Sequence, residues 1–154
     1  MLTSSGSAGS KKAERRTNAA WTSCHQSFKP TLADDLSADV DKLAKACADL
    51  TKMHLVSETF KGTQSATNVP QSYKFKAQAS HCYRAYAAAA PGIKDLDLLI
   101  KDSTGAVAGE DATDDPSPVA LEDGAVCFSA DDDATVVVSV GGGGGNFAIQ
   151  VWSD

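Results

Sequence analysis

The chain has 154 residues, of which 42% are hydrophobic, and a formal net charge of −6. This length suits one domain, or one compact domain with a smaller helical partner, and the hydrophobic share argues against a disordered chain. Residues 1–62 carry a net charge of +2 (nine Lys/Arg against seven Asp/Glu), whereas residues 63–154 carry −8 (five against thirteen). An acidic second half repels phosphate backbones, so the composition argues against nucleic acid as a partner.

Residues 1–10 (MLTSSGSAGS) are rich in Ser and Gly and are predicted to form a flexible tether or a remnant of cloning. They lack the apolar core of a signal peptide, so we expect no leader in this chain; a leader was either removed or lies upstream. No apolar stretch is long enough to span a bilayer. The one basic cluster, Lys11–Arg16, is short and contains Glu14, which favours a solvated helix start over a nucleic-acid patch.

Residues 11–62 are predicted to form a helical N-terminal segment with two helices. The first covers residues 11–28 and ends before Pro30, and the second covers residues 37–50. The second has an apolar stripe with the three-and-four spacing of an amphipathic helix. The stripe comprises Val40, Leu43, Ala44, Cys47 and Leu50.

Residues 63–154 change to the period of two that is typical of strands. Strands are predicted at residues 81–90, 93–101, 124–130, 135–140 and 146–152, and a further alternating run begins at Tyr73. Leu96, Leu98 and Ile100 are among the side chains expected to face a core about 10 Å thick. The predicted class is mainly β: an antiparallel, jelly-roll-like β-sandwich with the short helical segment before it.

Four cysteines are an even number for a short chain and permit three pairings. The simplest pairs Cys24 with Cys47 in the helical segment and Cys82 with Cys127 in the sandwich. Free buried thiols and a zinc site are the rival interpretations, although no CxxC pair occurs to favour zinc. Disulfides predict an oxidising compartment, hence a secreted, periplasmic or cell-surface protein.

The loops of the second half are acidic, and calcium is the one cofactor that they suggest. The candidate ligands are Asp95, Asp97, Asp111, Asp114 and Asp115. Their spacing matches no EF-hand, and solubility alone explains outward acids. The five glycines at 141–145 lack the following Lys and helix of a phosphate loop and predict a flexible hairpin instead.

No catalytic signature occurs, so no catalytic residue is predicted. The adjacent pairs Cys24–His25 and His81–Cys82 cannot act together because neighbouring side chains point in different directions. Trp152 and Tyr86 are the candidate binding surface, since an exposed aromatic ring can stack on a sugar or anchor a partner. Alternatively, Trp152 seals the joint between the sandwich and the helices.

The run CYRAYAAAAPGIKDLDLLIKDSTGAVAGEDATDD and the ending GGGGGNFAIQVW resemble a bacterial pre-peptidase C-terminal domain. The matching positions are the acidic strand 95–98, the D-x-x-G turn 102–105 and a closing hairpin at 145–151. The resemblance covers about residues 70–152. The helical segment before it has no counterpart in that family.

The resemblance implies a non-catalytic sandwich appended to secreted proteins, often proteases. Some relatives bind collagen or other polymers, and some bind calcium. No peptidase domain accompanies the module here. With its tether and helices, the chain looks more like a small bacterial surface lipoprotein or secreted protein.

The predicted function is therefore a non-catalytic binding or adhesion module outside the cytoplasm. Its partner would be a protein or an extracellular polymer, bound by an open sheet face or by the acidic loops. The alternative is a structural subunit whose helices mediate self-association. The third hypothesis is that the protein is an enzyme or an inhibitor.

Overall fold

The computed structural model describes residues 10–18, 21, 35–111, 119–120 and 124–154. Within these ranges the protein is mainly β, and every strand pairing is antiparallel. The elements are β1 (Ala13–Thr17), α2 (Leu36–Thr51), β2 (His54–Leu55), β3 (Phe60–Ser65), β4 (Gln71–Ala77), β5 (Cys82–Ala89), β6 (Ile93–Lys101), β7 (Val107–Glu110), β8 (Val119–Ala120), β9 (Gly124–Phe128) and β10 (Asp132–Ser153). No helix in these ranges has the length and apolar character needed to cross a bilayer.

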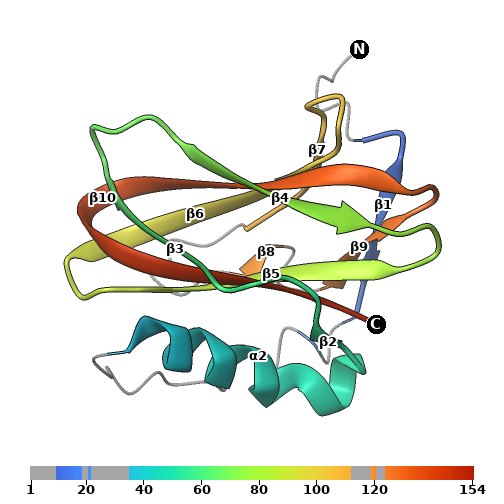
Figure 1. Ribbon diagram of the computed structural model, residues 1–154, viewed down its shortest axis with the longest axis horizontal. Coiled ribbons are helices and arrows are strands. Elements are labelled where there is room, and N and C mark those ends of the chain that lie inside the picture. Colours follow the sequence, from blue (N-terminus) through green and yellow to red (C-terminus); the bar gives the residue numbers. More distant parts are fainter. Residues whose placement is uncertain (1–9, 19–20, 22–34, 112–118, 121–123) are drawn as a thin grey trace.

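The strands form one nearly closed sheet with two facing halves, which β10 joins (Figure 1). Half A has the order β1–β9–β5–β10–β3 and uses the C-terminal part of β10. The short strands β8 and β2 also belong to half A and pair with β5 and β10. Half B has the order β4–β10–β6–β7 and uses the N-terminal part of β10. The mainly β, antiparallel prediction is confirmed, whereas a jelly roll of two separate sheets is not established because β10 belongs to both halves.

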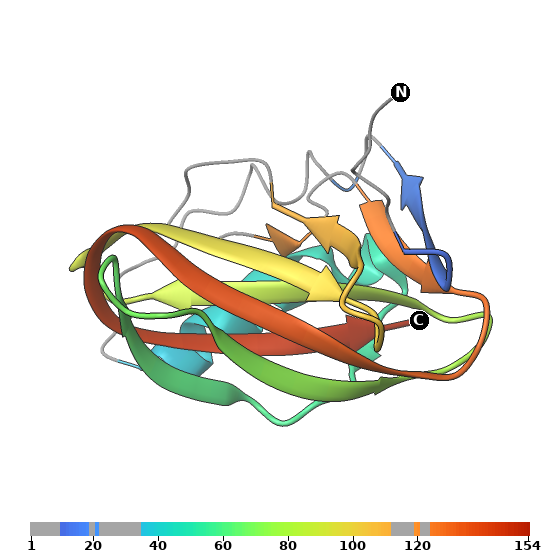
Figure 2. The same cartoon turned by 90° about the horizontal axis from the view of Figure 1, so that it is seen from above.

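The five glycines lie inside β10, so the predicted hairpin at 141–145 is wrong. The runs predicted as two strands, 135–140 and 146–152, are the two arms of one bent strand (Figure 2). The register of β10 against β6 shifts on both sides of Gly142. Gly143 has a φ of 79°, and a Cβ there would lie 2.1 Å from the carbonyl oxygen of Gly92. Glycine is therefore required where the strand bends against the β5–β6 turn.

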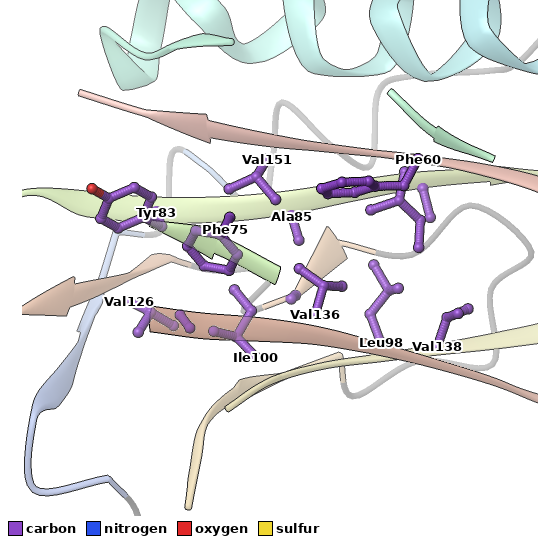
Figure 3. Packing of buried hydrophobic residues seen from close by; sticks show 14 of the residues in the cluster. Phe60, Phe75, Tyr83, Ala85, Leu98, Ile100, Val126, Val136, Val138 and Val151 are labelled. Carbon is purple, nitrogen blue, oxygen red and sulfur yellow. The ribbon is translucent and has the colours of Figure 1, made fainter. Parts of the chain in front are cut away.

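The main core lies between the two halves (Figure 3). The alternation predicted for β6 and for residues 135–140 of β10 is confirmed, because the expected inward side chains are buried and their neighbours are more exposed. In the C-terminal arm of β10 the expected inward side chains are also buried, but so are their neighbours Ala148, Gln150 and Trp152. Half B contributes Phe75, Leu96, Leu98, Ile100, Val136 and Val138. Half A contributes Phe60, Tyr83, Ala85, Val126, Phe128, Phe147, Ile149 and Val151. Ala85 and Ala87 of β5 lie opposite the larger Val151 and Ile149 of β10, so small and large side chains are neighbours in this core.

The helix α2 covers the outer face of half A and makes a third layer (Figure 1). Asp35 caps its first turn by accepting hydrogen bonds from the backbone N–H groups of Ser37 (3.0 Å) and Ala38 (3.4 Å). The left-handed residue Lys52 ends it. This confirms the helix predicted at 37–50, and its stripe residues Val40, Leu43, Ala44 and Cys47 are all buried.

The helix predicted at 11–28 is wrong over residues 13–17, which form β1. This strand pairs with β9, and four of its five side chains are exposed. Helix propensity is weak compared with the backbone hydrogen bonds that the open edge of β9 offers, so the tertiary structure overrides it. Trp21 has helical geometry, and residues 22–28 lie outside the described residues.

Strands from the predicted helical segment also take part in the sheet. Both β1 and β3 begin before residue 63 and pair with β9 and β10. The boundary predicted between residues 62 and 63 therefore falls inside β3.

Candidate functional site

The two halves differ in what covers them. The central strands of half A, β5, β9 and the C-terminal arm of β10, are buried on both faces, by half B on one side and by α2 on the other. Half B has its inner face in the core, and none of the described residues covers its outer face. Residues from β4, β6 and β10 surround a shallow hollow of about 730 Å³ on this outer face. We refer to it as the half B hollow.

The strand register sets the side chains of the hollow in rows. In the first row, Thr135 of β10 lies opposite Lys74 of β4 on one side and Lys101 of β6 on the other. Adjacent strands are about 4.8 Å apart, so the two lysine backbones are about 10 Å apart. The first row therefore has a hydroxyl side chain in the middle and a lysine side chain at each end.

The next row is more apolar. Val137 of β10 lies between Ser72 of β4 and Leu99 of β6. Both aliphatic side chains are half-buried although they point away from the core. A third row places Ser139 opposite Asp97. The hollow thus offers two cations, several hydroxyls and a small apolar floor, with the carboxylates of Asp97, Asp102 and Asp133 at its border.

One end of the hollow is closed by the turn that follows β6. Asp102 is buried, and its carboxylate accepts hydrogen bonds from the backbone N–H groups of Thr104 (2.8 Å) and Ala106 (3.1 Å). The hydroxyls of Ser10 and Thr104 donate to it as well. Burial acts to raise the pKa of Asp102, but these donors outweigh it and hold the pKa below its ordinary value. The carboxylate is consequently ionised and fixes the turn.

A second acid braces the same turn from β10. The backbone N–H of Ser103 donates to Asp132 (2.9 Å), and the Lys12 ammonium lies 3.2 Å from the same carboxylate. Lys12 also donates to the Ser103 hydroxyl (2.8 Å). Burial raises the pKa of Asp132, and the contacts with Ser103 and Lys12 lower it further than burial raises it. The segment before β1 is thereby tied to the end of the hollow.

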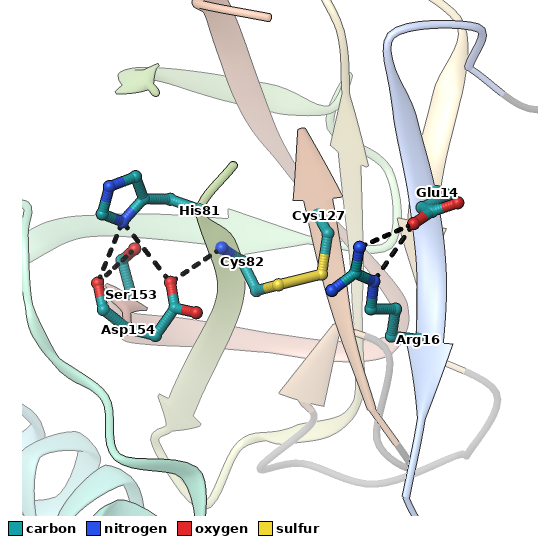
Figure 4. The surroundings of a disulfide bond; sticks show 7 residues. All are labelled: Glu14, Arg16, His81, Cys82, Cys127, Ser153 and Asp154. Carbon is teal, nitrogen blue, oxygen red and sulfur yellow. Dashed lines mark hydrogen bonds and ion pairs between the residues drawn. A yellow bond between two sulfur atoms is a disulfide. The ribbon is translucent and has the colours of Figure 1, made fainter. Parts of the chain in front are cut away.

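The predicted disulfide between Cys82 and Cys127 is present (Figure 4). The two residues are direct partners in β5 and β9, with sulfurs 2.02 Å apart. The backbone N–H of Cys82 also donates to the Asp154 carboxylate (2.9 Å). The sulfur of Cys82 is therefore held in a bond and offers no thiol to the neighbouring His81.

The other predicted pairing involves the helix. Cys47 is buried on the inner stripe of α2 and takes part in a disulfide. Cys24 and His25 lie outside the described residues, so the Cys24–Cys47 pairing stays a prediction.

The predicted calcium ligands are only partly described. Asp95 and Asp97 are half-buried on β6, and Asp111 accepts a hydrogen bond from the backbone N–H of Leu98 (2.7 Å). Asp114 and Asp115 lie outside the described residues. Among the residues that are described, no three His, Cys, Asp or Glu side chains are grouped as metal ligands. The calcium site stays a prediction.

The prediction that Trp152 and Tyr86 form an exposed binding surface is wrong, because the two side chains are only 5% and 1% exposed. They meet edge to face, with ring centroids 6.4 Å apart, beneath α2. The Trp152 indole N–H donates to Gln150 (3.0 Å), and Arg84 donates to the Tyr86 hydroxyl (2.8 Å). Trp152 thus seals the joint between sheet and helix, which is the alternative that the sequence left open.

The lysine row of the half B hollow was missed by sequence reasoning. The outward position of Lys74 and Lys101 followed from the alternation of their strands. Their placement on the two sides of Thr135 could not be predicted, because it depends on the register of three strands that are far apart in the sequence.

The chain is similar to several solved structures. The pre-peptidase C-terminal domain of a collagenase from Bacillus anthracis matches with a TM-score of 0.48 and 14% identity, over 61% of this chain and 87% of that one. A periplasmic inhibitor of g-type lysozyme from Aeromonas hydrophila matches with a TM-score of 0.40 and 8% identity, over 63% and 83% of the two chains. The resemblance stated from the sequence is thus found again among structures. No family model and no curated protein matches the chain.

Proposed function

We propose that this protein is a non-catalytic binding module that acts outside the cytoplasm and holds its ligand in the half B hollow. The observation that carries the proposal is the asymmetry of the sheet. The central strands of half A are covered on both faces, whereas among the described residues half B has an uncovered outer face. Polar and half-buried aliphatic side chains converge there.

The compartment is part of the proposal. The Cys82–Cys127 disulfide supports an oxidising environment, since such bonds persist mainly in secreted, periplasmic and surface proteins. The sandwich architecture that we infer for the two halves is one that presents a broad sheet face to a partner. An extracellular polymer or a protein fits such a face.

The alternative, self-assembly through the helices, has less support. The apolar stripe of α2 already packs against half A. The free edge of β4 carries Lys74 and Lys76, which oppose pairing with another sheet edge. Self-association stays a prediction without an observation that favours it.

The test is to block the half B hollow. Ser139→Cys, labelled with a bulky maleimide polymer, covers the hollow, and Lys42→Cys with the same label covers the exposed side of α2. Both proteins, with unlabelled wild type, are applied to a panel of immobilised extracellular polysaccharides and matrix proteins. We expect a panel member that binds wild type and labelled Lys42→Cys but not labelled Ser139→Cys. Absence of any bound panel member, or equal binding by both labelled variants, would overturn the proposal.

A further inference from the structure

The charge pattern of the half B hollow narrows the ligand that it can hold. Lys74 and Lys101 stand at the two ends of the Thr135 row, and neither ammonium is in an ion pair within the described part of the chain. They are about 10 Å apart at the backbone. Two cations at this separation on a flat face match a ligand with repeated negative groups, because each can meet a separate anionic group.

The acids that border the hollow are engaged elsewhere. Asp133 accepts a hydrogen bond from Lys76 (3.1 Å), and Asp132 is paired with Lys12. The Asp102 carboxylate already accepts hydrogen bonds from its own turn and from Ser10. Asp97, opposite Ser139 in the third row, also has an interaction partner. The two lysines of the row are therefore the charged groups of the hollow without an ion pair or side-chain hydrogen bond in the described part of the chain.

The remaining lining favours a sugar chain over a protein. Ser72, Ser103, Thr135 and Ser139 supply hydroxyls that can donate to or accept from sugar hydroxyls. Among the described residues that line the hollow, none is aromatic. Protein interfaces depend on buried Trp, Tyr or Arg anchors, and neutral sugars are held largely by stacking on aromatic rings. A ligand of the half B hollow must therefore be recognised by charge and by hydrogen bonds.

Building on the proposed function, we propose that the ligand of the half B hollow is a linear acidic polysaccharide. Its carboxylate or sulfate groups bind Lys74 and Lys101, and a sugar unit between them contacts Thr135. The chain as a whole has a net charge of −6, so general attraction to polyanions is unfavourable. Binding of a polyanion therefore has to come from a local arrangement such as this row.

The experiment compares two double variants that change the net charge equally. Lys74→Gln/Lys101→Gln removes the row, and Lys42→Gln/Lys61→Gln removes two exposed lysines of α2 and β3. Calorimetry measures binding of alginate oligosaccharides as the carboxylate probe and heparin oligosaccharides as the sulfate probe. Neutral dextran and poly-L-glutamate are the reference polymers. Thermal unfolding checks that each variant is folded.

We expect at least one acidic polysaccharide to bind wild type, and binding to weaken in high salt. The row variant should bind about tenfold more weakly, near the upper end of what two exposed ion pairs contribute, and the control variant less than twofold more weakly. Equal losses in the two variants, or binding of dextran, would contradict the proposal. Equal binding of poly-L-glutamate would replace the polysaccharide with an acidic protein. If the Ser139 block abolishes binding but the row variant does not, this inference fails and the proposed function stands.

Discussion

Gly143 is the residue on which the bend of β10 depends. Its backbone is left-handed, and the space for a side chain is filled by the carbonyl of Gly92. The next residue, Gly144, donates its N–H to the same carbonyl (3.0 Å). Gly142 beside it is different, because a Cβ there would make only ordinary contact, 3.8 Å from Lys94.

We therefore expect Gly143→Ala to lower the free energy of unfolding by about 2 kcal/mol or more, from left-handed strain and the clash together. Gly142→Ala is the matched control and should change it by less than about 0.5 kcal/mol. Urea unfolding followed by circular dichroism measures both. Similar effects of the two substitutions would show that the bend does not rely on Gly143.

Asp102 and Asp132 make stability depend on pH. Each has a pKa lowered from its ordinary value of 3.8 in the folded protein. A lowered pKa contributes stability that is fully present above the unfolded value and is lost as the pH falls through the folded value. The free energy of unfolding should therefore decrease as the pH drops below about 4.

The Asp102→Asn variant tests this attribution. It should be less stable than wild type by about 1–2 kcal/mol at neutral pH, because charge-assisted hydrogen bonds are lost. It should also depend less on pH in the acidic window. Urea titrations at a series of pH values give both quantities. If the stability of the variant fell with acid as steeply as that of wild type, groups other than Asp102 would cause the acid sensitivity.

At the scale of elements, α2 is held by its apolar stripe. Leu43 is fully buried against half A, while the adjacent Lys42 is exposed. Leu43→Ala should destabilise the protein by about 3 kcal/mol, as truncations of buried leucines do. Lys42→Ala should change stability by about 0.5 kcal/mol or less. Thermal and urea unfolding compare the two, and a small effect at Leu43 would mean that the helix is docked loosely.

Elements also differ in how far their sequences predict them. The three-and-four spacing of α2 and the period of two in β6 identified both, since each pattern reflects which side of the element is buried. Residues 13–17 carry charges and helix-forming residues, yet they form a strand. The edge of β9 decided this, and no local pattern in β1 contains that information.

At the scale of the molecule, the Cys82–Cys127 disulfide closes a loop with a sequence separation of 45 residues in half A. In the chain-entropy description, such a loop stabilises the folded state by about 4 kcal/mol. Cys82→Ser/Cys127→Ser should lose a stability of that order in urea unfolding. The wild type after selective reduction of this bond is the control. A loss under about 1 kcal/mol in both would show that the sheet pairing alone holds β5 and β9 together.

The amino-acid sequence by itself determined the mainly β class, the inward rows of β4, β6 and β10 and the helix α2, and it indicated Cys82–Cys127 as part of the simplest of three disulfide pairings. Each of these depends on periodicity or residue type, which are local properties of the chain. Only the tertiary structure decided that β10 runs unbroken through five glycines, that α2 buries Trp152 and Tyr86, and that Lys74 and Lys101 lie on the two sides of Thr135. Those features depend on which strands lie side by side and in what register, because backbone pairing and burial join segments that are distant in sequence.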